Sequence, residues 1–277
     1  MALRDILVQI NSYPEVTPEW ALAQASAIAR RFGARLSIGI CRVHIPPVSN
    51  WLANTLINAD GMIAAENHKS AQQAEAWLAR FGASIEESIR GEALIVECPG
   101  AVTHWKFSEK ARTYDLIVVP IYAHDQIVPL IEGLTFDTGR PVLLMTEQSG
   151  SNPFNKVVVG WDGSRAAARA LGDALPFLAA ARSVTIASVT GEKDMASRAP
   201  LPHIVRHLER HGITADTVEI PANGRDAGAA LQAYCKEAES DLLVMGAYGH
   251  SRAREFILGG ATRSVLENPV LPILLTH

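Results

Sequence analysis

The chain has 277 residues, of which 48% are hydrophobic and 19% are charged, a composition typical of globular rather than disordered proteins. This length is more than one small core needs, and it suits two domains of about 140 residues each. A formal net charge of -4 gives no support to a nucleic-acid partner or to binding of an anionic membrane surface.

The cysteines and the N-terminal segment bear on the cellular compartment. Cys41, Cys98 and Cys235 are widely separated and form no C-x-x-C pair. This pattern favours a reducing compartment and argues against a disulfide framework or a thiolate metal site. The opening residues, MALRDILVQI, contain a charged pair and only a short apolar run, which predicts neither a signal peptide nor a transmembrane span. We therefore expect a cytoplasmic protein without a membrane partner.

Short β-branched apolar runs alternate with amphipathic stretches along the chain. In the first half, strands are predicted at 5–10, 35–43, 94–98, 115–121 and 141–146, and helices at 18–32, 59–82, 100–113 and 127–138. In the second half, strands are predicted at 156–161, 183–189, 215–220, 241–247 and 271–277, and helices at 164–181, 201–212, 226–239 and 252–267. Nearly all-apolar strands separated by helices predict parallel sheets that are covered on both faces. The expected fold is α/β, with two tandem, doubly wound, five-stranded parallel-sheet domains.

The two halves repeat one pattern. DILVQINS at 5–12 aligns with KVVVGWDG at 156–163, and TYDLIVVP at 113–120 aligns with ESDLLVMG at 239–246. Internal similarity at half the chain length indicates a duplicated domain. The polar segment EQSGSNPFN at 147–155 reads as a linker, so the predicted domains are 1–147 and 155–277.

A glycine-rich segment, MGAYGHSRAREFILGGATRSVL at 245–266, follows the fourth predicted strand of the second half. Each glycine in an ordered segment costs about 0.5–1 kcal/mol relative to alanine, so a cluster of them needs a reason. Backbone N–H groups in glycine loops and at helix starts bind anions, and Arg252, Arg254 and Arg263 add positive charge nearby. The segment therefore suits a phosphate site, although glycines that serve turning and packing alone are the alternative. Neither a P-loop nor a G-x-G-x-x-G dinucleotide motif is present.

The spacing G-x2-G-x9-G, from Gly246 through Gly249 to Gly259, resembles the signature of universal stress proteins. GWDGS at 160–164 and DLLVMGAYGHSR at 241–252 are similar to that family as well. The resemblance covers both halves, so the chain is similar to the tandem type, with a Rossmann-like adenine-nucleotide-binding fold. In the first half it rests on the order of the elements and on the strand edges.

The resemblance implies that the second half binds ATP or another adenine nucleotide, with or without Mg²⁺. By analogy with the family's ATP-binding members, Asp162 would contact adenine and ribose, and Trp161 and Val189 would enclose the base. Met245 and Gly246 would lie near base and ribose. The phosphates would be bound by Gly249, Gly259, Gly260, Ala261 and Thr262. The family usually has Ser or Thr directly after the third glycine, where this chain has Gly260, so the hydroxyl would come from Thr262 or the site would use backbone N–H groups alone.

The aligned positions of the first half lack these residues. Asn11 aligns with Asp162, Pro120 with Gly246, and Ala123 with Gly249. Proline has no N–H donor and a fixed φ, so it cannot replace that glycine. We expect no nucleotide to bind in this way to the first half.

Other constellations give weaker signals. His203, His207 and His211 are spaced for a helical metal site, but they drift around the helix and no carboxylate or cysteine completes a set, so a solvated flank is the preferred interpretation. The apolar stretch at 51–81 fits a long core-packing helix, with a partner surface or an apolar ligand pocket as the alternative. No catalytic residues and no metal ligands are predicted.

Three functional hypotheses follow. The first is a nucleotide-responsive stress-response switch with one site in the second domain, and with at most slow ATP hydrolysis. The second is a nucleotide-free, dimerising interaction scaffold in which the glycines only serve packing. The third and weakest is a true enzyme of the wider adenine-nucleotide α/β hydrolase kind. The resemblance also implies that the two halves pair as a pseudo-dimer, and that two chains pair as a homodimer.

Overall fold

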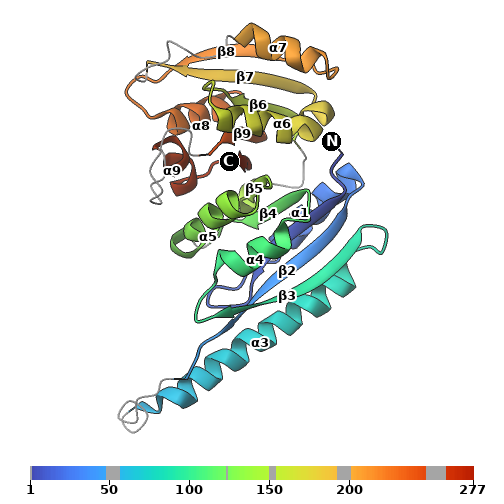
Figure 1. Ribbon diagram of the computed structural model, residues 1–277, viewed down its shortest axis with the longest axis vertical. Coiled ribbons are helices and arrows are strands. Elements are labelled where there is room, and N and C mark those ends of the chain that lie inside the picture. Colours follow the sequence, from blue (N-terminus) through green and yellow to red (C-terminus); the bar gives the residue numbers. More distant parts are fainter. Residues whose placement is uncertain (1, 48–56, 123, 150–153, 192–200, 248–259) are drawn as a thin grey trace. The chain divides into compact units, whose positions relative to one another are not determined.

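The computed structural model describes the chain except for residues 1, 48–56, 123, 150–153, 192–200 and 248–259. The chain forms two compact units (Figure 1). The N-terminal unit is Arg4–Thr138, and the C-terminal unit is Gly139–His277 together with the first residues of the chain. The predicted limits of the duplicated domains, 1–147 and 155–277, stay a prediction, because compactness alone does not define the repeat.

The N-terminal unit is built on four parallel strands in the order β3-β2-β1-β4. The strands are β1 (Asp5–Asn11), β2 (Arg35–His44), β3 (Arg90–Pro99) and β4 (Leu116–Pro120). The helices are α1 (Trp20–Phe32), α3 (Ala59–Ser84), α4 (His104–Ala111) and α5 (His124–Asp137). Strand side chains such as Ile6, Ile38 and Ile117 are fully buried, because helices cover the sheet as the apolar runs predict.

Helix α3 is the longest element of this unit, with 26 residues. Its later turns bury Trp77 and Phe81, while its first turns extend past the strand ends and leave Met62 61% exposed (Figure 1). The predicted core-packing role therefore holds for the second part of the helix only. Among the described residues, no helix combines the length and the apolar composition that crossing a lipid bilayer requires.

The C-terminal unit contains the order β5-β10-β9-β6-β7-β8. Its strands are β5 (Val142–Met145), β6 (Lys156–Gly160), β7 (Ser183–Thr190), β8 (Asp216–Pro221), β9 (Leu242–Gly246) and β10 (Ile273–Thr276). Its helices are the short η1 (Glu147–Ser149), α6 (Arg165–Ala180), α7 (Leu201–Glu209), α8 (Ala227–Glu237) and α9 (Gly260–Glu267). Strands β6 to β10 are mutually parallel, as the sequence predicts.

Strand β5 differs from the expectation of five parallel strands in each half. It pairs antiparallel with β10, with Leu143 opposite Leu274 and Leu144 opposite Ile273, and it groups with the C-terminal unit. Both strands are wholly buried and apolar except for Thr276 at the end of β10, so burial is satisfied equally well in either direction. Their sequences therefore predict two strands and say nothing about the partner of each.

Candidate functional site at the strand ends of the C-terminal unit

The order of strands reverses between β6 and β9. From β6 the chain continues through β7 to β8 on one side, and β9 and β10 lie on the other side. Val159 of β6 pairs with Val244 of β9, so these two strands run side by side. Asp162 follows β6 and Gly246 ends β9, which brings both to the carboxyl edge at the reversal. In doubly wound sheets this is where ligands bind.

The turn after β6 starts helix α6. Gly163 has φ 74°, a left-handed conformation that glycine adopts without steric cost. Oδ1 of Asp162 accepts a 2.8 Å hydrogen bond from the Ser164 amide, and Oγ of Ser164 accepts a 3.0 Å hydrogen bond from the Ala167 amide. Ser164 is thus the N-cap of α6, and the half-buried Asp162 holds the turn that sets it. The carboxylate and the positive end of a helix dipole therefore share this edge.

The three apolar residues predicted to border the base are largely buried. Trp161 is 8% exposed, Val189 is 7% exposed and Met245 is 5% exposed. The amide of Trp161 donates a 2.8 Å hydrogen bond to the carbonyl of Ala187, which keeps the segment in line with β7. These side chains supply an apolar layer beneath the strand ends, and little of their surface is open.

The four glycines of the segment 245–266 have different structural settings. A Cβ atom at Gly246 would clash with the backbone of Ala166 and Ala167 in the first turn of α6, so packing alone requires glycine there. A Cβ atom at Gly260 would have no described atom within 4 Å, so packing does not explain that glycine. Gly249 and Gly259 lie outside the described residues.

Helix α9 begins with the last predicted phosphate-binding residues. Gly260 is exposed, Ala261 is half-buried and Thr262 is only 2% exposed. A Cβ atom at Gly228 in α8 would meet the carbonyl oxygen of Ala261, which shows how closely the two helices pack. Thr262 therefore belongs to the packed side of α9, and the exposed N-terminus is formed by Gly260.

The positive charge around this segment is partly neutralised. Nε of Arg263 lies 2.6 Å from Oε1 of Glu267, one turn further along α9, and the hydrogen bond to Glu267 raises the pKa of the guanidinium. Arg252 and Arg254 lie outside the described residues. Among the residues that are described, His, Cys, Asp and Glu form no group of three or more arranged to hold a metal ion.

Residues 153–277 match the model of the universal stress protein family. These residues are slightly less than half of the chain, and over them the chain is similar to that family. A curated relative, universal stress protein Slr1230 from Synechocystis, is 27% identical over 139 residues, which are 49% of this chain and 46% of the relative. The chain thus matches less than half the length of that relative.

Solved structures extend the similarity in fold to both halves. A universal stress protein from Archaeoglobus fulgidus aligns with a TM-score of 0.70 at 18% identity, over 98% of this chain and 97% of its own. A putative universal stress protein from Pseudomonas aeruginosa aligns with a TM-score of 0.57 at 15% identity, over 99% and 93%. The resemblance to universal stress proteins and the α/β fold are confirmed.

In the N-terminal unit, internal hydrogen bonds occupy the position that aligns with Asp162. Nδ2 of Asn11 donates a 3.0 Å hydrogen bond to the Tyr122 hydroxyl, and Oδ1 of Asn11 accepts a 2.5 Å hydrogen bond from Nε2 of Gln9. The Tyr122 hydroxyl also lies 3.1 Å from Oγ1 of Thr17 and donates a 3.0 Å hydrogen bond to the Glu15 carbonyl. Burial raises the pKa of Tyr122, which therefore stays a neutral donor.

The sequence pattern identifies Asn11 but does not predict the rest of this buried polar cluster. Tyr122 lies two residues beyond Pro120 and aligns with Tyr248 of the second half, so the alignment does not single it out as particular to the first half. The available signal was a polar residue, Gln9, inside an otherwise apolar strand. Such a side chain needs a buried partner, and here that partner is Asn11.

Proposed function

We propose that the C-terminal unit binds an adenine nucleotide at the carboxyl edge of β6 and β9, and that binding makes the chain a stress-response switch. The proposal rests on one observation. Asp162 and Gly246 lie at the same carboxyl edge of the sheet, where the strand order reverses, in the half of the chain that matches the universal stress protein family. A nucleotide that binds one conformation better than another shifts the population toward it. Slow hydrolysis would be incidental to this role.

The proposed contacts divide into a base side and a phosphate side. Asp162 accepts hydrogen bonds from ribose or base, and its described contacts are compatible with this, since only Oδ1 is engaged, by the Ser164 amide. Trp161, Val189 and Met245 form the apolar layer beside the base. The phosphates would be bound by backbone N–H groups of Gly249, Gly259 and Gly260, at the N-terminus of α9. A bound triphosphate supplies negative charge, and its phosphate oxygens would bind Mg²⁺ if the ion is part of the complex.

We propose further that the N-terminal unit binds no nucleotide in this way. Both ends of the Asn11 amide are hydrogen-bonded internally, and Pro120 offers no N–H donor. The chain would therefore hold one adenylate.

The first test is direct release of bound nucleotide. The full chain is purified without dialysis and denatured, and the released small molecules are identified by mass spectrometry. One adenylate per chain supports the proposal and gives the phosphate count. Calorimetric titration of emptied protein with ATP, ADP and AMP then compares wild type with Asp162→Asn, which keeps an oxygen acceptor for the Ser164 amide but loses the charge. We expect roughly tenfold or greater loss of affinity, the equivalent of about 1.4 kcal/mol.

The alternative is a nucleotide-free interaction scaffold. One observation favours it: the close approach of Gly246 to the α6 backbone accounts for that glycine without a ligand. A chain that is empty on purification and also ignores added adenylates would support the scaffold. Light scattering coupled to size exclusion would then show whether it pairs as the homodimer that the resemblance implies.

A further inference from the structure

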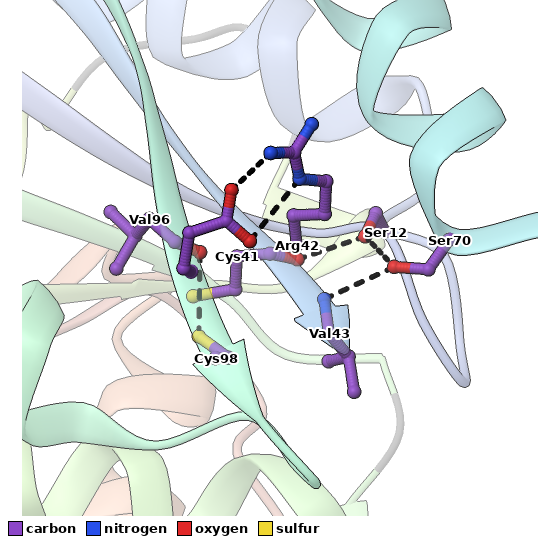
Figure 2. A network of polar contacts seen from close by, with 8 residues as sticks. Ser12, Cys41, Arg42, Val43, Ser70, Val96 and Cys98 are labelled. Atoms are coloured by element: carbon purple, nitrogen blue, oxygen red, sulfur yellow. Dashed lines mark hydrogen bonds and ion pairs between the residues drawn. The ribbon is translucent and has the colours of Figure 1, made fainter. Parts of the chain in front are cut away.

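Cys41 and Cys98 lie on the same face of two neighbouring strands in the N-terminal unit. In the β2–β3 register, Cys41 is opposite Val96, and Cys98 is opposite Val43. Side chains two residues apart on a strand point to the same face, so the two cysteines are diagonal neighbours. The Cys98 thiol donates to the carbonyl oxygen of Val96 over 3.6 Å, which turns its sulfur back along β3 toward Cys41 (Figure 2). The two thiols are close enough for each to shift the pKa of the other.

The surroundings of this thiol pair are polar on one side and close to solvent on the other. Nε2 of Gln9 donates a 3.8 Å hydrogen bond to the Cys41 sulfur. Cys98 is buried but is the penultimate residue of β3, and the two residues that follow it, Pro99 and Gly100, are exposed. Cys98 is therefore separated by one residue position from an exposed part of the chain.

A bond between the two sulfurs requires a small strand movement. Diagonal neighbours on adjacent strands have Cα atoms about 7–8 Å apart, whereas disulfides need separations below about 7 Å. Strand β3 is the outermost strand and has β2 as its neighbour on one side only. The β2–β3 register is already irregular between Leu36 and Ile38. The outer strand can therefore shift without breaking the rest of the sheet.

We propose that Cys41 and Cys98 are an oxidant-responsive dithiol, which hydrogen peroxide converts into an intrachain disulfide. The Cys98 thiolate attacks one peroxide oxygen, the O–O bond breaks, and the leaving hydroxide takes up a proton to give water and a Cys98 sulfenic acid. The Cys41 sulfur then attacks the Cys98 sulfur, the S–O bond breaks, and the Cys41 proton leaves with the hydroxide as a second water. Two thiols and one peroxide thus give one disulfide and two waters.

The electrostatics assign different roles to the two thiols. The neighbouring Cys41 thiol lowers the pKa of Cys98 to about 7, aided by the Thr103 backbone and the Lys106 charge and opposed by burial. The interaction with Cys98, together with burial, raises the pKa of Cys41. Cys98 is therefore the thiol that reacts first, and Cys41 resolves the sulfenic acid.

The third cysteine is a matched control within the same chain. Cys235 is also buried, but it lies in the C-terminal unit, and burial raises its pKa to about 12. Burial alone therefore predicts equal protection for all three cysteines, whereas the dithiol proposal predicts selective oxidation of two. We expect Cys98 to be oxidised at least about tenfold faster than Cys235.

The test exposes the reduced full-length chain to hydrogen peroxide, stops the reaction with catalase, and alkylates the denatured protein with N-ethylmaleimide. Intact mass and peptide mapping should show alkylation at Cys235 only, a cross-linked Cys41–Cys98 peptide pair, and recovery of all three sites after dithiothreitol. Full alkylation of all three cysteines after peroxide would overturn the proposal. So would oxidation of Cys235 at the same rate, or over-oxidised Cys98 without the cross-link.

Variants separate the pair from general oxidation. Cys235→Ser should form the disulfide as wild type does, while Cys41→Ser and Cys98→Ser should not. Circular dichroism checks that each variant is folded. If either pair variant fails to fold, the wild-type peptide map and Cys235→Ser still decide the question.

Discussion

Gly246 illustrates how one residue of a binding motif can be required by packing as well. Its missing Cβ leaves space for the backbone of Ala166 and Ala167 at the start of α6. We predict that Gly246→Ala destabilises the protein by about 1–3 kcal/mol, the usual cost of overpacking a rigid contact. Urea unfolding monitored by circular dichroism measures this. Gly260→Ala is the control, because no described atom lies within 4 Å of a Cβ at that position, and it should change stability by less than about 1 kcal/mol. Equal stability of both variants would contradict the packing argument.

Cys98 gives the proposed dithiol a defined pH dependence. Its pKa of about 7 lies below the ordinary value of 9.0, so the thiolate fraction increases as the pH rises through about 7. Disulfide formation should therefore be slow at about pH 6, accelerate toward about pH 8, and then level off. The facing groups from neighbouring elements are the Cys41 thiol of β2 and the Lys106 ammonium of α4.

The profile is measured as the peroxide oxidation rate at several pH values. Lys106→Gln removes the positive charge near Cys98, so the midpoint of the rate-against-pH profile of this variant should move to higher pH. A rate that does not change between these pH values would show that thiolate formation at Cys98 does not limit the reaction.

At the scale of elements, the apolar runs predicted strands well, because a strand buried on both faces needs little beyond β-branched apolar residues. Strand β3 is the instructive exception: the hydrophobic pattern predicts 94–98, while the strand covers Arg90–Pro99. The residues missed at its start include Arg90 and Glu92, which are partly or fully exposed, as an outermost strand allows, and polar residues hide a strand from a hydrophobicity pattern. The antiparallel direction of β5 could not be predicted either, because the hydrophobic pattern of one strand does not specify which strand it pairs with.

The pairing of β5 with β10 predicts which strands lose hydrogen-exchange protection when a residue of β5 is mutated. Leu143 is fully buried and lies opposite Leu274. Leu143→Ala should lower the protection of β9 and β10 amides from hydrogen exchange, with a loss of about 2–5 kcal/mol. Leu116→Ala in β4, equally buried, is the matched control and should act on the N-terminal unit. If Leu143→Ala lowered only the protection of β1 to β4, the grouping of β5 with the C-terminal unit would be wrong.

At the scale of the whole molecule, the sequence could predict the strand-end position of Asp162, because this position follows from periodicity and topology, while the duplication stays a prediction. The sequence could not predict the hydrogen bonds around Asn11, the residue that aligns with Asp162. These depend on Tyr122, whose hydroxyl is brought to Asn11 by a hydrogen bond between residues 111 positions apart in the chain. Contacts of this range leave no local pattern. The two units therefore look more alike in the order of their elements than they are in side-chain chemistry at the aligned positions Asn11 and Asp162.

This difference predicts an asymmetric response to adenine nucleotide. A ligand that binds only the folded state, present at about 100 times its dissociation constant, stabilises that state by about 2.7 kcal/mol. If the single site lies at the strand ends of β6 and β9, the gain in hydrogen-exchange protection should be found in the C-terminal unit and be absent from β1 and β4. Asp162→Asn should remove the gain, whereas Asn11→Ala, at the aligned position of the other copy, should keep it. Equal gains in hydrogen-exchange protection in both units, or two nucleotides bound per chain, would mean that Tyr122 and its hydrogen bonds do not prevent nucleotide binding to the N-terminal unit. The same experiment on peroxide-treated protein separates the two proposals, because the disulfide forms in the unit that this ligand does not touch.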